Sequence, residues 1–146
     1  MNKEIEINNK EAITYMDVTE ALFEIYINHN NIFDNYTEFT EYGRKRGWLE
    51  EQDLTYANLK IDRRSLARII HEFIRIELGV EDINDWSNAK KLKDLYDCRV
   101  CAKHVAQMVE RNIIPPRKPD RFGLLDRVSR EEFQHLLLHI SKPFIG

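Results

Sequence analysis

Two cysteines and a histidine, Cys98, Cys101 and His104, follow one another at intervals of three residues in a segment with helical spacing. A CxxC pair can supply half of a zinc site or, within a βαβ unit, the redox pair of a thioredoxin-like protein. The sequence has no second cysteine pair and no βαβ pattern around this one. Because Cys101 lies on the apolar face of the expected helix, we expect it to pack in the core, with both thiols reduced and free of metal.

The other ionisable residues do not show a catalytic spacing. His71, His135 and His139 lie on expected helices, with no serine, cysteine or aspartate placed to complete a triad. The acidic residues are distributed along exposed helix faces, which argues against a pair of catalytic carboxylates. We therefore expect a protein that is not an enzyme and that uses no cofactor and no metal ion.

The most distinctive pattern marks the start of a helix near the end of the chain. Ser129 can act as the N-cap, and Glu132 can bond back to the amide of Ser129, which together make a capping box. Arg130 then occupies the first helical position, where the helix dipole disfavours a cation by roughly 0.3–1 kcal/mol. The same order, a capping residue followed by an arginine, occurs at Asp62 and Arg63.

A third start, at Thr14 and Tyr15, has a tyrosine in the position of the arginine. Two interpretations of the arginines remain open: each pairs with a nearby carboxylate on the surface, or each joins the free helix amides to form an anion site. Tyr15 is expected to pack, with stacking on a sugar as the alternative. Helix capping by itself accounts for the cap residues. The candidate ligand-binding residues are Arg63, Arg130, Arg64, Asp62, Ser129, Glu132 and Tyr15.

Helices are the elements that must position these residues. Apolar residues recur at helical spacing in five segments: residues 14–28, 37–47, 62–79, 100–111 and 129–142. Gly47 and Gly79 close the second and third segments, and Pro143 ends the last. Residues 50–60 are expected to form a loop, and residues 87–92 a short helix. Each of the three capped helices has an apolar stripe that it cannot bury alone, so we expect them to pack against one another, with Arg63 and Arg130 partly exposed.

No alternating strand pattern competes with the helices, so the predicted fold class is all-α, a compact bundle of helix–loop–helix repeats. We expect residues 1–146 to form a single domain, with residues 1–12 frayed. Within it, a lone capped helix (13–29), a repeat unit (37–79), an insertion (80–97) and a second repeat unit (98–142) follow one another.

The composition is that of an ordinary folded, helix-rich protein, with 42% apolar and 32% charged residues in 146. The net charge of −3 does not favour nucleic acid as a partner. No run of 18 apolar residues is present, so membrane insertion is not expected. Residues 1–6 are polar and acidic and cannot serve as a signal peptide. We therefore expect either a cytoplasmic protein or a piece of a larger protein exported to the cell surface.

The last repeat unit resembles an S-layer homology (SLH) repeat. The resemblance is carried by Asp94, by the helix end Arg111-Asn112-Ile113-Ile114, and by the segment from Phe122 to Glu132 that contains Ser129 and Arg130. The middle unit, with Arg46-Gly47-Trp48-Leu49 and Leu59 to Ser65, and the start at residues 13–17 are weaker matches. Together they cover most of residues 13–140.

The resemblance implies three repeats in a pseudo-threefold helical body whose helix-start arginines bind anionic, pyruvylated cell-wall polysaccharide. The leading hypothesis is thus a non-catalytic module that binds such a carbohydrate through Arg63 and Arg130. The alternative is a cytosolic adaptor or inhibitor that binds another protein on the same scaffold. The absent signal peptide, the cysteines expected to be reduced and the tyrosine at position 15 favour the alternative, and the well-matched segment at Arg130 favours the carbohydrate. The sequence does not indicate an oligomeric state.

Overall fold

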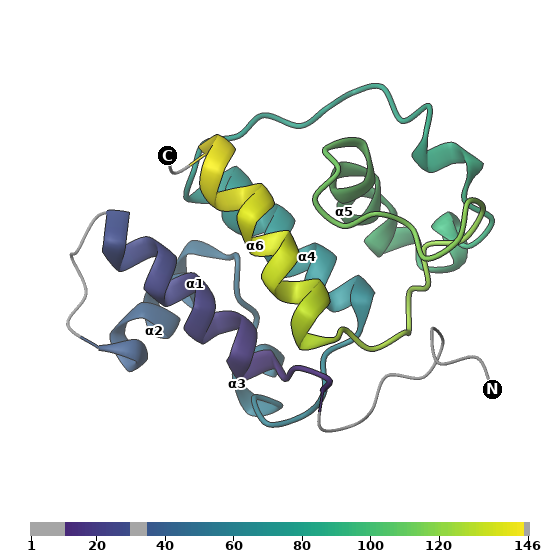
Figure 1. The fold of residues 1–146 in the computed structure, drawn as a ribbon. Coiled ribbons are helices and arrows are strands. Elements are labelled where there is room, and N and C mark those ends of the chain that lie inside the picture. Colours follow the sequence, from purple (N-terminus) through teal and green to yellow (C-terminus); the bar gives the residue numbers. More distant parts are fainter. Residues whose placement is uncertain (1–10, 30–34, 145–146) are drawn as a thin grey trace.

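The computed structural model describes residues 11–29 and 35–144 (Figure 1). Of the expected fraying of residues 1–12, the part at residues 1–10 lies outside the described residues, and the part at Ala12 is wrong, because Ala12 is buried and bridged to Ser129. The helices are α1 (Tyr15–His29), α2 (Tyr36–Arg46), α3 (Glu51–Thr55), α4 (Arg63–Ile76), α5 (Arg99–Glu110) and α6 (Arg130–Phe144). Two 3₁₀ turns, η1 (Ala89–Lys91) and η2 (Leu95–Asp97), precede α5. The described ranges contain isolated β-bridges and no strand, which confirms the predicted all-α fold class.

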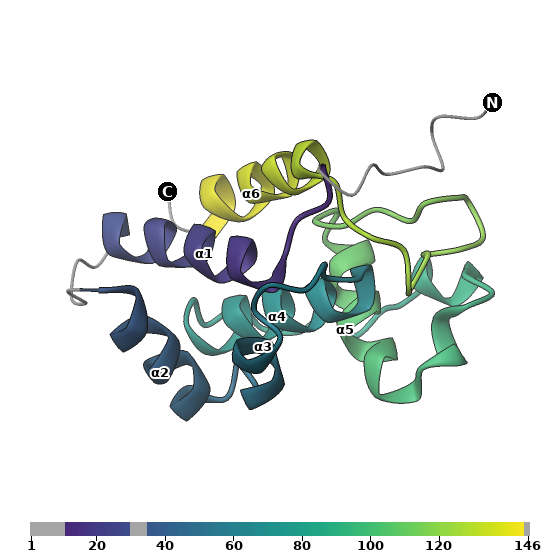
Figure 2. The same cartoon turned by 90° about the horizontal axis from the view of Figure 1, so that it is seen from below.

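The three capped helices, α1, α4 and α6, bury their apolar stripes in one hydrophobic core. Figure 2 shows α1 and α6 on the same side of α4, and α5 packs against α4 further along. The core side chains from these three helices are Val18 and Leu22 of α1, Leu66, Ala67, Ile69, Ile70, Phe73 and Ile74 of α4, and Phe133, Leu136 and Ile140 of α6. None of the helices in the described ranges combines the length and the hydropathy needed to cross a bilayer.

The three short segments that lead into these helices are hydrogen-bonded to one another. They are residues 12–14, 60–62 and 127–129, and their bridges join Ala12 to Ser129, Thr14 to Lys60, and Asp62 to Arg127. The first residue of each segment therefore pairs with the third residue of another, so the pairing runs in a ring. The middle residues, Ile13, Ile61 and Val128, are completely buried. This ring brings the N-termini of α1, α4 and α6 to one place in the fold.

The turn after α2 is the one that the sequence predicts. Gly47 adopts φ +97°, which favours glycine, and the amides of Gly47 and Leu49 both donate to the carbonyl of Gly43. Trp48 then folds back on α2 so closely that a Cβ at position 43 would lie 2.7 Å from its ring. A glycine inside α2 is thus explained by the close approach of the indole.

Three local predictions are wrong. The expected loop at residues 50–60 contains α3, which is stabilised by a capping box between Glu50 and Asp53. The short helix expected at residues 87–92 is only the 3₁₀ turn η1. The last helix does not end before Pro143 but continues to Phe144, because a proline in a final turn removes only one backbone hydrogen bond. A five-residue helix such as α3 has too few residues to show a periodic pattern.

The prediction of reduced cysteines is also wrong, because Cys98 and Cys101 form a disulfide with their Cα atoms 5.2 Å apart. Cys98 is not part of the regular helix. It is the N-cap of α5 and has extended backbone angles, whereas Cys101 lies in the first turn. An extended residue before a helix can bring the two sulfurs together, at a Cα separation within the usual range for disulfides.

Candidate functional site

All three predicted helix caps are present at the ring of helix starts. Thr14 Oγ1 accepts from the amide of Asp17 at 3.1 Å, Asp62 Oδ1 from Ser65 at 2.8 Å, and Ser129 Oγ from Glu132 at 3.0 Å. Only the cap at Thr14 is reciprocal, since the carboxylate of Asp17 accepts from the Thr14 amide at 2.9 Å. The box predicted at Ser129 is half formed, because both oxygens of Glu132 bind arginines instead.

The first-turn side chains of the three helices form a second ring of contacts around the first. The Tyr15 hydroxyl of α1 donates to Ser65 Oγ of α4 at 3.2 Å. The Arg63 guanidinium of α4 donates to the carboxylate of Glu132 in α6. Arg130 of α6 lies 3.5 Å from the carboxylate of Asp17 in α1. In each case the residue at the first helical position contacts the third-position residue of another helix. The odd position of the arginines is therefore explained by a neighbouring helix.

Arg63 is buried, with 1% of its surface exposed, so the expectation that it is partly exposed is wrong. Its Nε donates to the carbonyl of Phe122 at 3.0 Å, its Nη2 donates to the carbonyl of Pro115, and its guanidinium lies 4.5 Å above the Phe122 ring. Burial lowers the pKa of Arg63 to about 10, against the opposing charge of Glu132. Every nitrogen of this guanidinium already donates within the protein, so it cannot reach a ligand.

Asp94 holds in place the loop that covers Arg63. Its carboxylate is buried and accepts from the amides of Phe122 at 2.8 Å and Gly123 at 2.9 Å. Burial favours the neutral acid, but the hydrogen bonds from these amides outweigh it and lower the pKa of Asp94 below its usual value. The aspartate that contributes to the SLH resemblance thus has a structural role here.

The remaining predicted arginines lie at the surface. The Arg130 side chain is 55% exposed, and the Arg64 side chain is 42% exposed with its Nε 3.3 Å from Asp62. These two cations remain available beside helix starts, whereas Arg63 does not. Their role in ligand binding remains a prediction.

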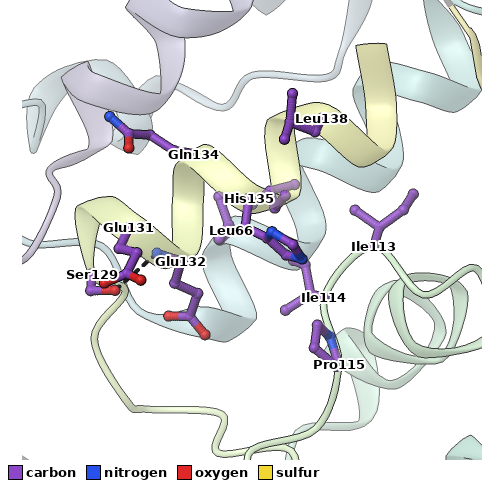
Figure 3. A pocket seen from close by; sticks show the side chains of 11 residues that line it. Leu66, Ile113, Ile114, Pro115, Ser129, Glu131, Glu132, Gln134, His135 and Leu138 are labelled. Atoms are coloured by element: carbon purple, nitrogen blue, oxygen red, sulfur yellow. Dashed lines mark hydrogen bonds between the residues drawn. The ribbon is translucent and has the colours of Figure 1, made fainter. Parts of the chain in front are cut away.

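A pocket of about 560 Å³ lies between the first half of α6 and the turn that follows α5 (Figure 3). Its apolar lining comes from Leu66, Ile113, Ile114, Pro115, Leu136 and Leu138, and its polar lining from Ser129, Glu131, Glu132, Gln134 and His135. We call it the α6 groove. Two predicted site residues, Ser129 and Glu132, therefore border a real hollow.

The floor of the α6 groove depends on the turn at the end of α5. Asn112 adopts φ +57°, and the amides of Ile113 and Ile114 both donate to the carbonyl of Met108, which ends the helix. Sequence reasoning noted this turn as part of the SLH resemblance but did not connect it to a pocket. The only available signal was the pair of isoleucines before two prolines, an apolar segment that cannot continue a helix.

No known family model matches the chain, and no curated protein matches it significantly.

Proposed function

We propose that the chain is a non-catalytic binding module that holds a short segment of a partner protein in the α6 groove. The observation that carries this proposal is the lining: six apolar side chains form the hollow, and acidic residues border it. Leu138 is 61% exposed at the edge of the groove, where a monomer gains nothing from an apolar side chain. A bound peptide would bury it.

The charge of the groove indicates the kind of segment that fits. Glu131 is exposed on α6 and lines the groove, while Glu132 is already paired with Arg63 and Arg117. An uncompensated carboxylate beside apolar side chains favours a segment with a lysine or arginine next to one or two apolar residues. The same carboxylate disfavours an anionic ligand in this groove.

Selection of displayed peptides on the purified chain tests the proposal. We expect enriched peptides that combine apolar residues with a basic one, with affinity reduced at least tenfold by Leu138→Asp. The matched control is Leu125→Asp, because Leu125 is 68% exposed and does not line the groove. Equal losses in the two variants, or the absence of any enriched motif, would reject the α6 groove as a peptide site.

The carbohydrate hypothesis remains a second candidate, supported by the cyclic pairing of three helix starts and by the exposed Arg64 and Arg130. It is tested by co-sedimentation with purified Gram-positive cell-wall material, with and without its anionic polysaccharide. Because Arg63 is buried, the appropriate variant is R64A/R130A rather than one that removes Arg63. Binding that requires the polysaccharide and is lost in this variant would favour a cell-surface module. The absence of sedimentation would favour the protein partner, in the cytoplasm if the chain functions alone.

A further inference from the structure

A polar cluster with no role in the α6 groove lies between α4 and α5. Its members are His71 and Glu72 of α4 and His104 of α5. His71 is buried, with 1% of its surface exposed, and the side chains of Glu72 and His104 are mostly buried. The Nδ1 atoms of the two histidines face each other at 2.8 Å, and Glu72 Oε1 lies 3.9 Å from His104 Nδ1. One nitrogen from each imidazole and one carboxylate oxygen lie within 4.8 Å of one another.

The orientation of His71 is fixed by a fourth residue, Asp82, on the far side of the ring. Its Oδ1 lies 2.7 Å from His71 Nε2, which places a proton on that nitrogen in the neutral ring. His71 Nδ1 then carries a lone pair directed into the cluster. A histidine that donates one ring N–H to a carboxylate and offers the other nitrogen is the usual arrangement of a metal ligand with its supporting residue.

Glu72 is also held by a partner that leaves one oxygen available. Arg75 Nε donates to Glu72 Oε2 at 2.8 Å, and Oε1 is the oxygen near His104. At 3.9 Å from His104 Nδ1, Oε1 is too far for a hydrogen bond. Without a bound ion, the cluster makes one bond between its rings and leaves the carboxylate oxygen beside them unused.

We propose that His71 Nδ1, His104 Nδ1 and Glu72 Oε1 bind a divalent transition-metal ion of the zinc type, with Asp82 supporting His71. Two imidazoles and one carboxylate select zinc or a similar ion over magnesium or calcium, which prefer oxygen ligands. Bonds of about 2.0–2.1 Å in a tetrahedral site require the two nitrogens to stand roughly 3.3 Å apart. Small rotations of the two side chains would widen the present 2.8 Å to that distance. The fourth position is left for water or a ligand.

The alternative is a purely structural contact between two helices. It predicts that metal ions leave the protein unchanged, whereas a bound ion would link α4 to α5 and stabilise the folded state. The disulfide occupies both cysteine sulfurs, so Cys98 and Cys101 are excluded as ligands while it is intact. The two interpretations therefore differ in measurable binding.

The test is titration of the chelator-treated, disulfide-intact chain with Co²⁺, followed by Zn²⁺ competition against a chromophoric chelator. We expect one ion per chain and the visible absorption of four-coordinate cobalt, without the near-ultraviolet band of thiolate ligands. H104A and E72Q should each bind the metal ion at least tenfold more weakly than the wild type. Asp82→Asn should weaken it roughly 10–100-fold, the usual effect of removing a supporting carboxylate. Zn²⁺ should raise the melting temperature of the wild type but not of E72Q.

The matched control is H135A/H139A. These two histidines of α6 have rings 5.0 Å apart and are one helical turn from each other, so they form the competing surface site. The proposal is wrong if binding is lost in this control or is unchanged in both E72Q and H104A. It is also wrong if the wild type binds no ion, or if a thiolate band places the metal at the cysteines. E72Q replaces one oxygen by an amide nitrogen and keeps the size of a side chain that is 16% exposed, so it serves as the test even if H104A does not fold.

Discussion

The start of α4 and the start of α6 have the same local sequence pattern and opposite environments. At α4, Arg63 is covered by the loop of residues 115–122 and is buried against Phe122. At α6, Arg130 has more than half of its side chain exposed and lies 3.5 Å from the carboxylate of Asp17. A cap followed by an arginine thus specifies the start of a helix in both places. Whether the arginine is a buried structural residue or an exposed one that a ligand could reach depends on the segments that pack over it.

The largest expected difference between the two starts is in stability. R63A leaves two carbonyls and one oxygen of Glu132 without their donor, at buried or partly buried positions. We therefore expect a loss of about 3 kcal/mol or more in the free energy of unfolding. Urea denaturation followed by far-ultraviolet circular dichroism measures it. If R63A lowers the free energy of unfolding no more than R130A does, the two arginines contribute equally to stability and the proposed difference between the two helix starts is wrong.

A smaller loss of stability is expected from D94N. This substitution weakens the hydrogen bonds that hold the loop over Arg63 and leaves Arg63 itself unchanged. Replacing one charged acceptor of two buried amides should cost about 1–3 kcal/mol at neutral pH. Because the pKa of Asp94 is lowered on folding, its stabilising contribution is complete above the unfolded value of about 3.9 and is lost as the pH falls through the folded value.

The stabilities of the wild type and D94N should therefore begin to converge as the pH falls below about 3.9, the unfolded pKa of aspartate, and become equal below the lower folded pKa. Urea denaturation from pH 7 to pH 3 measures this difference. A gap between the two proteins that stays constant over that range would show that Asp94 does not contribute through its charge.

The smallest loss in the free energy of unfolding, about 0–1 kcal/mol, is expected from R130A. An exposed ion pair contributes little to stability, and the helix dipole opposes a cation at that position. The small contribution should decrease further in high salt, where exposed charges are screened. Urea denaturation at low and high NaCl concentrations measures both. A loss above about 2 kcal/mol, or one that does not respond to salt, would place Arg130 with Arg63 as a structural residue.

Features that depend on neighbouring residues could be predicted from the sequence, and features that depend on distant ones could not. The caps at Thr14, Asp62 and Ser129 and the glycine turn at Gly47 follow from local hydrogen bonding, and the structure contains them. The burial of Arg63 was not predictable, because its partners come from the loop after α5 and from α6.

The candidate sites illustrate the same limit. Ser129 and Glu132 were chosen for their capping pattern, yet the hollow beside them is completed by Ile113 and Ile114, which come from another turn of the chain. His71 and His104 are both visible in the sequence, but nothing in their spacing indicates that α4 and α5 bring them together. The disulfide is a local feature that was missed for another reason: Cys98 and Cys101 were treated as a helical i, i+3 pair, whereas Cys98 is the extended N-cap of α5.

The ring of segments 12–14, 60–62 and 127–129 has a consequence for the order of folding. Ile13 donates to the carbonyl of Val128, so one of the central hydrogen bonds joins residues near opposite ends of the described chain. During synthesis, α1 and α4 are complete long before residue 128 emerges, and until then the carbonyl partner of Ile13 does not exist. Contacts this distant in sequence form late and slow the overall rate. We therefore expect closure of the ring to be a late step of folding, with α4 and α5, whose contacts are closer in sequence, as the earlier nucleus.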